Sequence, residues 1–415
     1  MSTATLHSEK KKTLIPQLRF KGFDGFWKEI LLEDFAKRGS GHTPNKSYPE
    51  YYNGEINWIS LTDSKKLDNG YIEFTNTKIT QLGLDNSSAV LHPAGSVLLS
   101  RDAGVGKSAV MKHSMAVSQH FIVWSPKENF SSNWFLYNVL QILKPEFERI
   151  AIGSTIKTIG LPYFKKLKIT VPTFPEQQKI ASFLSAVDEK IQQLSRKKEL
   201  LEQYKKGVMQ QLFSGKLRFK DENGEDYPDW EEKKLGEVCD VRDGTHDSPK
   251  YVDKGFPFIT SKNLMKNGSI DFENVSFINE LDYNKVNQRS KVNINDILFG
   301  MIGTIGNPVL VKSEGFAIKN VALIKEKKDL LNLFLIHFLK GDSINQQFFE
   351  QNTGGTQKFL SLSVIRNLIA IVPPLPEQQK IANFLSSIDI KIENVNGEIG
   401  KTQLFKKGLL QQMFV

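Results

Sequence analysis

The octapeptide Arg101–Ser108, RDAGVGKS, ends like a phosphate-binding loop, in which main-chain amides and a lysine hold the phosphates of a nucleotide. That loop requires glycine at its first position, where this chain has Arg101. A second copy of the segment reads MIGTIGNP, with Asn307 and Pro308 replacing the lysine and serine. We therefore expect a glycine-rich turn between two strands. A nucleotide-hydrolysing enzyme is kept as an alternative.

No other group of reactive side chains fits an enzyme. The seven histidines form no HExxH segment or closely spaced pair, and no GxSxG segment occurs. No glycine-rich cofactor motif accompanies the Asn/Asp-Pro-Pro-aromatic signature of methyltransferases, because VPP at Val372 lacks both flanking residues. The chain is predicted to have no catalytic residue and to bind no metal or cofactor itself.

The composition describes a chain of at least two domains. It has 415 residues, of which 40% are hydrophobic and 24% charged. The net charge of +9 favours a polyanionic partner without establishing one. The one cysteine, Cys239, fits a reducing compartment. Neither a signal peptide nor a run of roughly 18 apolar residues is present, so we expect a cytoplasmic protein with no membrane partner.

The elements that would position any site come from a tandem duplication. The phrase FPEQQKIASFLSAVDEKI at Phe174–Ile191 returns as LPEQQKIANFLSSIDIKI at Leu375–Ile392, an offset of 375 − 174 = 201 residues. GSTIK likewise returns as GGTQK, and YKKGVMQQLF as FKKGLLQQMF. LRFKG at Leu18 resembles LRFKD at Leu217, so each repeat begins with the tail that follows a long helix.

Each repeat is predicted to fold as an α+β domain followed by one long helix. Short β-rich runs such as GSVLLS and NDILFG are separated by turn residues and followed by helical patterns. The predicted segments are an N-terminal tail (1–16), a first globular domain (17–172), a first spacer helix (173–214), a second globular domain (215–373) and a second spacer helix (374–415).

The two long helices are predicted to pair. Pro175 and Pro376 suit a first helical turn, and apolar residues in steps of four and three form a coiled-coil seam in both helices. An ordinary amphipathic core helix is the alternative. A helix of about 39 residues is roughly 58 Å long, more than the roughly 35–40 Å of such a domain. The connection therefore favours an antiparallel coiled coil with one domain at each end, related by an approximate two-fold axis.

These features carry a resemblance to a known family. The paired PEQQKIA helices, the GSTIK segment, and the openings GSGHTPNKSYPEYYNGEINWISLTD and RDGTHDSPKYVDKGFPFITSKNL resemble the DNA specificity subunit of type I restriction-modification systems over nearly all 415 residues. The resemblance implies two target-recognition domains, each reading half of an asymmetric, bipartite site on double-stranded DNA. It also implies two methyltransferase subunits and two restriction subunits as partners. S-adenosylmethionine, ATP and Mg would then be bound by those partners.

The repeat selects candidate DNA-contacting loops, since Arg and Lys can pair with guanine and Asn with adenine. In the first domain the candidates are Gly41, His42, Thr43, Lys46, Ser60, Thr62, Asp63, Lys65, Arg101, Lys107 and Lys157. In the second domain they are Arg242, Thr245, His246, Lys250, Ser261, Lys262, Asn263 and Lys358. The alternative is that these turns and lysines are plain loop surface.

The doubled PEQQKIA phrase is interpreted as a junction with a partner protein. Because it occurs at the start of both helices, Glu176, Gln177, Glu377 and Gln378 are predicted to bind the methyltransferase subunits and to leave the recognised sequence unaltered. A coiled-coil scaffold that does not read DNA is the alternative function.

Overall fold

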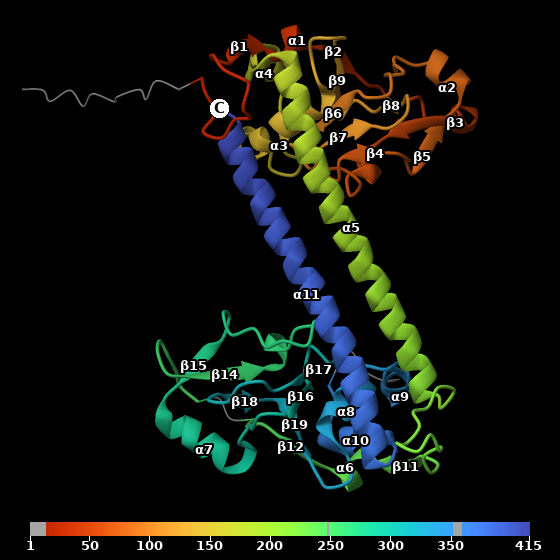
Figure 1. Cartoon of the computed structure of the whole chain (residues 1–415), viewed down its shortest axis with the longest axis vertical. Helices are drawn as coiled ribbons and strands as arrows, with labels where there is room; N and C mark the ends of the chain where they lie inside the picture. The colour runs from red at the N-terminus through yellow and green to blue at the C-terminus, as the bar shows by residue number, and fades with distance from the viewer. Residues whose placement is uncertain (1–13, 247–248, 352–358) are drawn as a thin grey trace, which may run out of the picture. The chain divides into compact units, whose positions relative to one another are not determined.

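The computed structural model describes residues 14–246, 249–351 and 359–415, which form two compact units (Figure 1). Unit 1 contains the chain up to Ser195 together with Gly397–Val415, and unit 2 contains Arg196–Asn396. Two long helices, α5 (Phe174–Phe213) and α11 (Leu375–Met413), contribute to both units. Helices and strands are mixed in each unit, as the sequence predicted.

Unit 1 contains three sheets in which antiparallel pairs predominate. The five-stranded sheet has the order β2-β9-β6-β7-β4, the three-stranded sheet the order β5-β3-β8, and β1 pairs with β10. The strands are β1 (Lys28–Leu31), β2 (Ala36–Ser40), β3 (Tyr52–Ile59), β4 (Tyr71–Ile72), β5 (Thr77–Ile79), β6 (Val97–Ser100), β7 (Ser108–Met111), β8 (Ala116–Val117), β9 (Phe121–Pro126) and β10 (Lys168–Val171).

Unit 2 repeats this plan with two four-stranded sheets, β12-β19-β16-β17 and β13-β15-β14-β18, and the pair β11-β20. Its strands are β11 (Glu231–Lys234), β12 (Cys239–Asp243), β13 (Tyr251–Val252), β14 (Phe256–Thr260), β15 (Ser276–Ile278), β16 (Ile297–Gly300), β17 (Gly306–Leu310), β18 (Ala317–Lys319), β19 (Val321–Glu326) and β20 (Ile369–Val372). The parallel pairs β3-β8 and β14-β18 occupy the same place in the two units.

The shorter helices also recur. Unit 1 contains α1 (Leu32–Phe35), α2 (Gln81–Asp85), α3 (Asn133–Ile150) and α4 (Leu161–Lys166). Unit 2 contains α6 (Leu235–Val238), α7 (Glu280–Ser290), α8 (Asn332–Phe338), α9 (Asp342–Gln351) and α10 (Leu362–Asn367). Three 3-10 turns complete the described elements: η1 (Pro49–Tyr51), η2 (Leu61–Asp63) and η3 (Ser261–Asn263).

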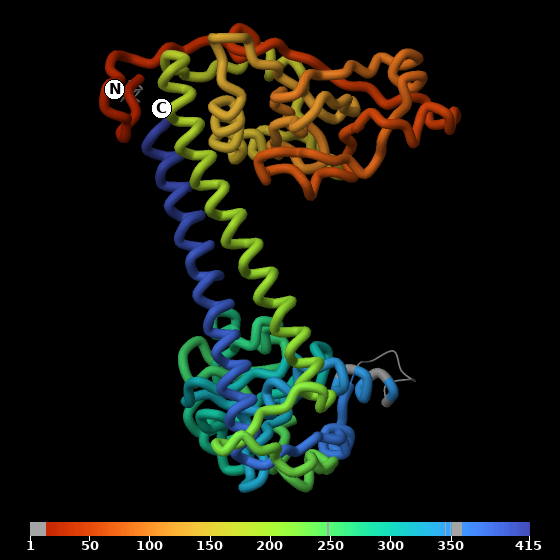
Figure 2. The backbone as a smooth tube through the Cα atoms, turned by 45° about the vertical axis from the view of Figure 1, so that its right-hand side comes forward, coloured from red at the N-terminus to blue at the C-terminus, as the bar shows by residue number. Residues whose placement is uncertain are grey.

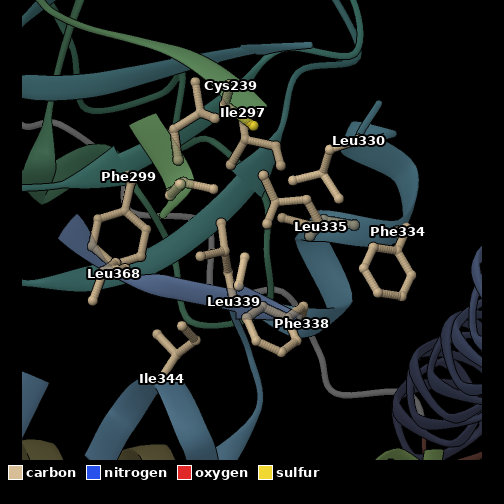
Figure 3. Packing of buried hydrophobic residues seen from close by; sticks show 14 of the residues in the cluster. Cys239, Ile297, Phe299, Leu330, Phe334, Leu335, Phe338, Leu339, Ile344 and Leu368 are labelled. Carbon is tan, nitrogen blue, oxygen red and sulfur yellow. The ribbon is translucent and has the colours of Figure 1, made fainter. Parts of the chain in front are cut away.

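The main core of unit 2 lies between its four-stranded β12 sheet, α8 and the long helices. Cys239, Phe299 and Leu335 point into the same cluster (Figure 3), and all three are buried. Burial raises the pKa of the Cys239 thiol to about 12. The thiol is therefore protonated at neutral pH, and the side chain serves as a packing residue of this core.

Within each unit the segments of the long helices run antiparallel. In unit 1, Lys406 Nζ contacts Asp188 Oδ1 at 2.6 Å, and the adjoining core joins Leu184 to Leu409. In unit 2, Lys205 Nζ contacts Asp389 Oδ1 at 2.5 Å. Figure 2 shows the two segments side by side in each unit. The ion pairs are equivalent in the repeat, since 188 + 201 = 389 and 205 + 201 = 406.

A phenylalanine at or next to the end of each long helix packs into a core. Phe414, next to the end of α11, stacks on Phe135 of α3 with ring centroids 5.2 Å apart. Phe213, the last residue of α5, packs edge-on against Phe338 of α8 at 5.3 Å. The helix ends therefore belong to the globular cores. Among the described residues, no helix is long and apolar enough to span a membrane.

Candidate nucleic-acid interface

Two equivalent turns contain four of the residues that were predicted to contact DNA: Ser60, Asp63, Ser261 and Asn263. Asp63 accepts hydrogen bonds from the main-chain N–H groups of Ser60 at 3.1 Å and Asn76 at 2.8 Å. Asn263 does the same in unit 2, accepting from the N–H of Thr260 at 3.0 Å. Each side chain closes a 3-10 turn at the end of a strand, as capping residues do.

Burial removes these side chains from contact with bases, contrary to the sequence prediction. Asp63 is 0% exposed and Asn263 is 6% exposed. Ser60 and Ser261 are also buried, and Ser261 Oγ donates to the main-chain oxygen of Asn320 at 3.0 Å. A buried polar group that is already hydrogen-bonded stabilises its turn. In these two turns the exposed candidates are Thr62, Lys65 and Lys262.

The first predicted loop of unit 1 is held against the turn between β8 and β9. The N–H of His42 donates to Val117 O at 3.0 Å, and Thr43 Oγ1 donates to Gln119 Oε1 at 2.6 Å. A Cβ on Gly41 would lie 1.9 Å from Val117 O, so only glycine allows this approach. Gly41 therefore serves the backbone, while His42 and Gln119 are exposed.

Unit 2 builds the same arrangement from different residues. The N–H of Thr245 donates to Ile318 O at 3.2 Å, and His246 Nδ1 lies 2.7 Å from Asn320 Oδ1. The pair His246–Asn320 thus occupies the position of Thr43–Gln119. The main-chain hydrogen bonds that hold the loop are the same in both units, whereas the exposed polar side chains differ.

Three side chains contact the carboxylate of Asp102 in unit 1, and only one of them, Arg101, was predicted as a site residue. His120 Nδ1 lies 2.9 Å from Asp102 Oδ2, Thr158 Oγ1 donates to the other carboxylate oxygen, and Arg101 Nε lies 3.5 Å from Oδ1. Burial opposes ionisation of Asp102, but the hydrogen bonds from Thr158 and His120 and the charge of Arg101 outweigh it and lower the pKa. An ionised Asp102 therefore joins the loops around residues 101 and 157.

The glycine-rich segment 101–108 is a turn between strands, as predicted. Ser108 begins β7, so a strand follows the segment where a phosphate-binding loop would have a helix. Lys107 Nζ donates to Ser64 O at 3.1 Å and is half-buried. Lys107 thus ties this turn to η2, which does not fit the nucleotide-hydrolysing alternative.

Asp243 is an acidic centre of unit 2 at a different position in the repeat, since Ile302 is the residue that aligns with Asp102. Its buried carboxylate lies 2.8 Å from His246 Nε2 and also pairs with Arg289 of α7. The hydrogen bond to Asn320 is the largest cause that raises the pKa of His246, and the bond to Asp243 is the next. Arg242 is exposed, contacts Asp240 at 2.6 Å and donates to Arg289 O at 3.2 Å.

The remaining candidates are exposed lysines on loops. Lys46, Lys157 and Lys250 are exposed. The main-chain oxygen of Lys157 accepts a bond from the N–H of Ala103 at 3.3 Å, which places this lysine beside the glycine-rich turn. Lys358 lies outside the described residues.

Sequence reasoning missed Asp102, Thr158 and Asp243. It also missed four further polar residues of these sites: Gln119, His120, Arg289 and Asn320. Three of them lie in the short turn before a buried strand, in the segments SQHF and KNVA. A polar pair before an apolar strand, repeated in both copies, was the available signal. Arg289 gave no such signal, because only tertiary folding brings α7 beside Asp243.

The predicted partner-binding residues lie inside each unit. Glu176 accepts two hydrogen bonds of 2.7 Å from Arg19. Glu377 accepts bonds from Arg218 at 3.1 and 2.7 Å and from Trp230 Nε1 at 2.7 Å. The arginines belong to the repeated LRFK tails, so these pairs explain why the tail recurs with the helix.

The two glutamines satisfy main-chain groups at the same junctions. Gln177 Oε1 accepts from the N–H of Ser132, just before α3, at 3.0 Å. Gln378 Oε1 accepts from the N–H of Leu331, just before α8, at 2.8 Å. Glu176, Gln177, Glu377 and Gln378 are each at most 2% exposed. Direct partner contact is therefore wrong as a role for them: they fix the helix starts to the domains.

Comparison with known proteins agrees with this architecture. The chain shares 26% identity over 410 residues with the type I restriction enzyme MjaIX specificity subunit of Methanocaldococcus jannaschii, covering 93% of this chain and 92% of the relative. It shares 21% identity over 385 residues with the EcoKI specificity subunit of Escherichia coli K12, covering 86% and 82%. The crystal structure of the type I restriction-modification S subunit from M. genitalium has a TM-score of 0.61 at 17% identity, covering 97% and 99%.

The fold is thus that of a two-domain specificity protein. The profile described as type I restriction modification DNA specificity domain matches residues 26–203 and 227–401. Since these ranges contain most of the chain, the chain belongs to the family of type I restriction-modification specificity subunits and carries two target-recognition domains.

His246 tests the acidic centre of unit 2. We expect nuclear magnetic resonance titration to give a His246 pKa above 6.5, because Asn320 and Asp243 stabilise the protonated ring. Asp243→Asn should lower this pKa. His92, whose pKa is lowered by burial, is the internal control and should not respond. An unchanged His246 pKa in Asp243→Asn would contradict the assignment.

The junction can be tested by breaking one buried pair. Arg218→Met leaves the Glu377 carboxylate buried without its guanidinium, and should lower the stability of unit 2 by roughly 3 kcal/mol. The double variant Arg218→Met with Glu377→Leu should lose less, because no uncompensated charge remains. Urea unfolding followed by the fluorescence of Trp230 measures both. Equal losses in the two variants would argue against the role of the pair.

Proposed function

We propose that this chain is the non-catalytic, DNA-reading subunit of a type I restriction-modification complex and recognises an asymmetric, bipartite site. The observation that carries the proposal is the pair Thr43–Gln119 in unit 1 and its equivalent His246–Asn320 in unit 2. The two units hold these loops by the same main-chain contacts but present different side chains on them, which suits the reading of two different half-sites. Glutamine and asparagine are the residue types that read adenine edges.

The long helices are proposed to form one antiparallel coiled coil that sets the spacing of the half-sites. Support comes from the ion pairs Asp188–Lys406 and Lys205–Asp389, which are equivalent in the repeat. A pseudo-two-fold relation of the units would follow from them. Half-sites on one face of a duplex are separated by about 34 Å per turn, a distance compatible with helices of about 58 Å.

The chemistry is assigned to partner subunits. The described residues contain no group of three or more His, Cys, Asp or Glu that could hold a metal ion. We propose that two methyltransferase subunits bind S-adenosylmethionine and two restriction subunits bind ATP and Mg, in the cytoplasm. This chain would supply their position on double-stranded DNA.

Exposed aromatic residues replace the buried Glu and Gln pairs as candidate partner contacts. Tyr204 and Phe405 occupy the same position in the repeat, since 204 + 201 = 405. They are 53% and 56% exposed. Large exposed apolar groups at recurring positions are typical of protein interaction sites. Each unit therefore offers one such residue to one copy of a partner.

Base reading is tested by one substitution in each unit. Gln119→Ala and Asn320→Gly should each relax selectivity in a different half-site, by about 1–3 kcal/mol. Glycine is chosen at position 320 because Asn320 has φ of 52°. Footprinting of the assembled complex on a randomised library measures both, and each variant is the control for the other. Relaxation of the same positions by both variants would contradict the assignment of one half-site to each unit. Indifference of the wild type to sequence would favour the scaffold alternative.

Partner recruitment is tested separately. Tyr204→Lys and Phe405→Lys should each weaken binding of the methyltransferase subunit by about tenfold or more, because each removes an apolar anchor. Sedimentation of the purified subunits measures the assembly. Lys206→Gln, on the same helix as Tyr204, is the matched control and should assemble normally. Full assembly of both lysine variants would contradict this surface.

A further inference from the structure

We propose that Ile302 and Phe359 form an apolar contact of unit 2 that recognises the 5-methyl group of a thymine in the major groove. This inference rests on the proposed function and deepens it, since it names a base that one half-site must contain. The two side chains are 39% and 49% exposed. Neither residue belongs to the polar pairs to which base reading was assigned.

Ile302 and Phe359 are neighbours across two chain segments that are far apart in the sequence. They form an isolated antiparallel bridge. Directly opposed residues in an antiparallel pair place their side chains on the same face, with Cβ atoms about 4.5–5.5 Å apart. The two exposed side chains therefore form one apolar surface.

Unit 1 builds the equivalent bridge from polar residues. Asp102 and Thr158 are bridge partners there, and they correspond to Ile302 and Phe359 at offsets of 302 − 102 = 200 and 359 − 158 = 201. The Thr158 hydroxyl donates to the Asp102 carboxylate. Unit 2 thus has two apolar side chains where unit 1 has a hydrogen-bonded polar pair.

The main chain holds the bridge in the same way in both units. The N–H of Ile159 donates to Arg101 O at 3.0 Å, and the N–H of Leu360 donates to Met301 O at 2.8 Å. Such bonds do not depend on side-chain identity. The difference between the units at this place therefore lies in the side chains, and so in the chemistry that each unit can recognise.

The apolar pair lies next to the polar pair His246–Asn320. Ser261 Oγ accepts a hydrogen bond from the N–H of Ile302 at 3.4 Å and donates to Asn320 O at 3.0 Å. One hydroxyl therefore joins the two pairs. Lys262, the next residue, is exposed and suits a DNA phosphate. Ile302 thus adjoins groups that fit base edges and the DNA backbone, which favours DNA over a protein as the occupant.

The methyl group of thymine is the part of a base edge that fits an apolar pair. Among the four unmodified bases, thymine alone presents an apolar group in the major groove, and phenylalanine is one of the side chains that contact it. Burial of Ile302 and Phe359 against this methyl group would remove apolar surface from water. A base with only polar groups at this place would lose hydration without gaining a hydrogen bond.

The experiment uses the assembled complex and duplexes in which each thymine of one half-site, on either strand, is replaced in turn by deoxyuridine. The half-site is the one that Asn320→Gly relaxes. Uracil keeps the hydrogen-bonding groups of thymine and lacks only the methyl group. We expect the wild type to bind one of these duplexes about fourfold more weakly, the loss expected for one buried methyl group. Fluorescence anisotropy measures the affinities.

Substitution of the pair should remove this preference. Ile302→Ala and Phe359→Ala should each reduce the difference between thymine and uracil to about twofold or less. The double variant Ile302→Asp with Phe359→Thr installs the residues of unit 1 and should abolish it. Ile294→Ala is the matched control, because Ile294 is 55% exposed and precedes the opposite end of β16. This control should keep the fourfold difference.

The proposal is overturned if no thymine of that half-site responds to uracil, or if both alanine variants keep the full difference. Loss of methyltransferase binding by the alanine variants would also overturn it, because the pair would then be a protein contact. Failure of the proposed function is distinguishable, since the wild-type complex would then give no sequence-specific footprint at all.

Discussion

The buried ion pair at the start of each long helix is the interaction on which the rest of the structure depends. Glu176 and Glu377 are almost completely buried, and each accepts two bonds from an arginine of the LRFK tail. A buried carboxylate without its partner is strongly destabilising. The pair therefore forces tail, helix start and domain to assemble together, and Gln177 and Gln378 extend the junction to α3 and α8.

The same junction allows two domains with different surfaces to share one frame. The main-chain contacts His42–Val117 and Thr245–Ile318 are equivalent, whereas the side chains that they position differ between the units. Backbone hydrogen bonds do not depend on side-chain identity. The loops can therefore vary in what they present while their position is preserved, which suits a protein family that recognises DNA targets.

Electrostatics separate the two units further. Asp102 and Asp243 each hold a histidine near the polar turn, but the partners of these carboxylates differ. In unit 1, Asp68 pairs with Lys144 of α3 at 2.7 Å, whereas in unit 2 Asp243 pairs with Arg289 of α7. An internal duplication thus produced two units whose folds agree and whose ion pairs differ.

The sequence by itself determined the duplication, the α and β composition of each repeat and the long helices, because these depend on local periodicity and on phrases such as PEQQKIA that recur at a fixed offset. It also placed Arg101, Lys107 and Lys157 in loops. Tertiary structure alone decided which polar side chains face solvent: Asp63, Asn263 and the Glu and Gln pairs have the residue types of an interface and are buried in turns and junctions. Burial depends on contacts between residues far apart in the chain, such as Arg19 with Glu176, and no local pattern contains that information.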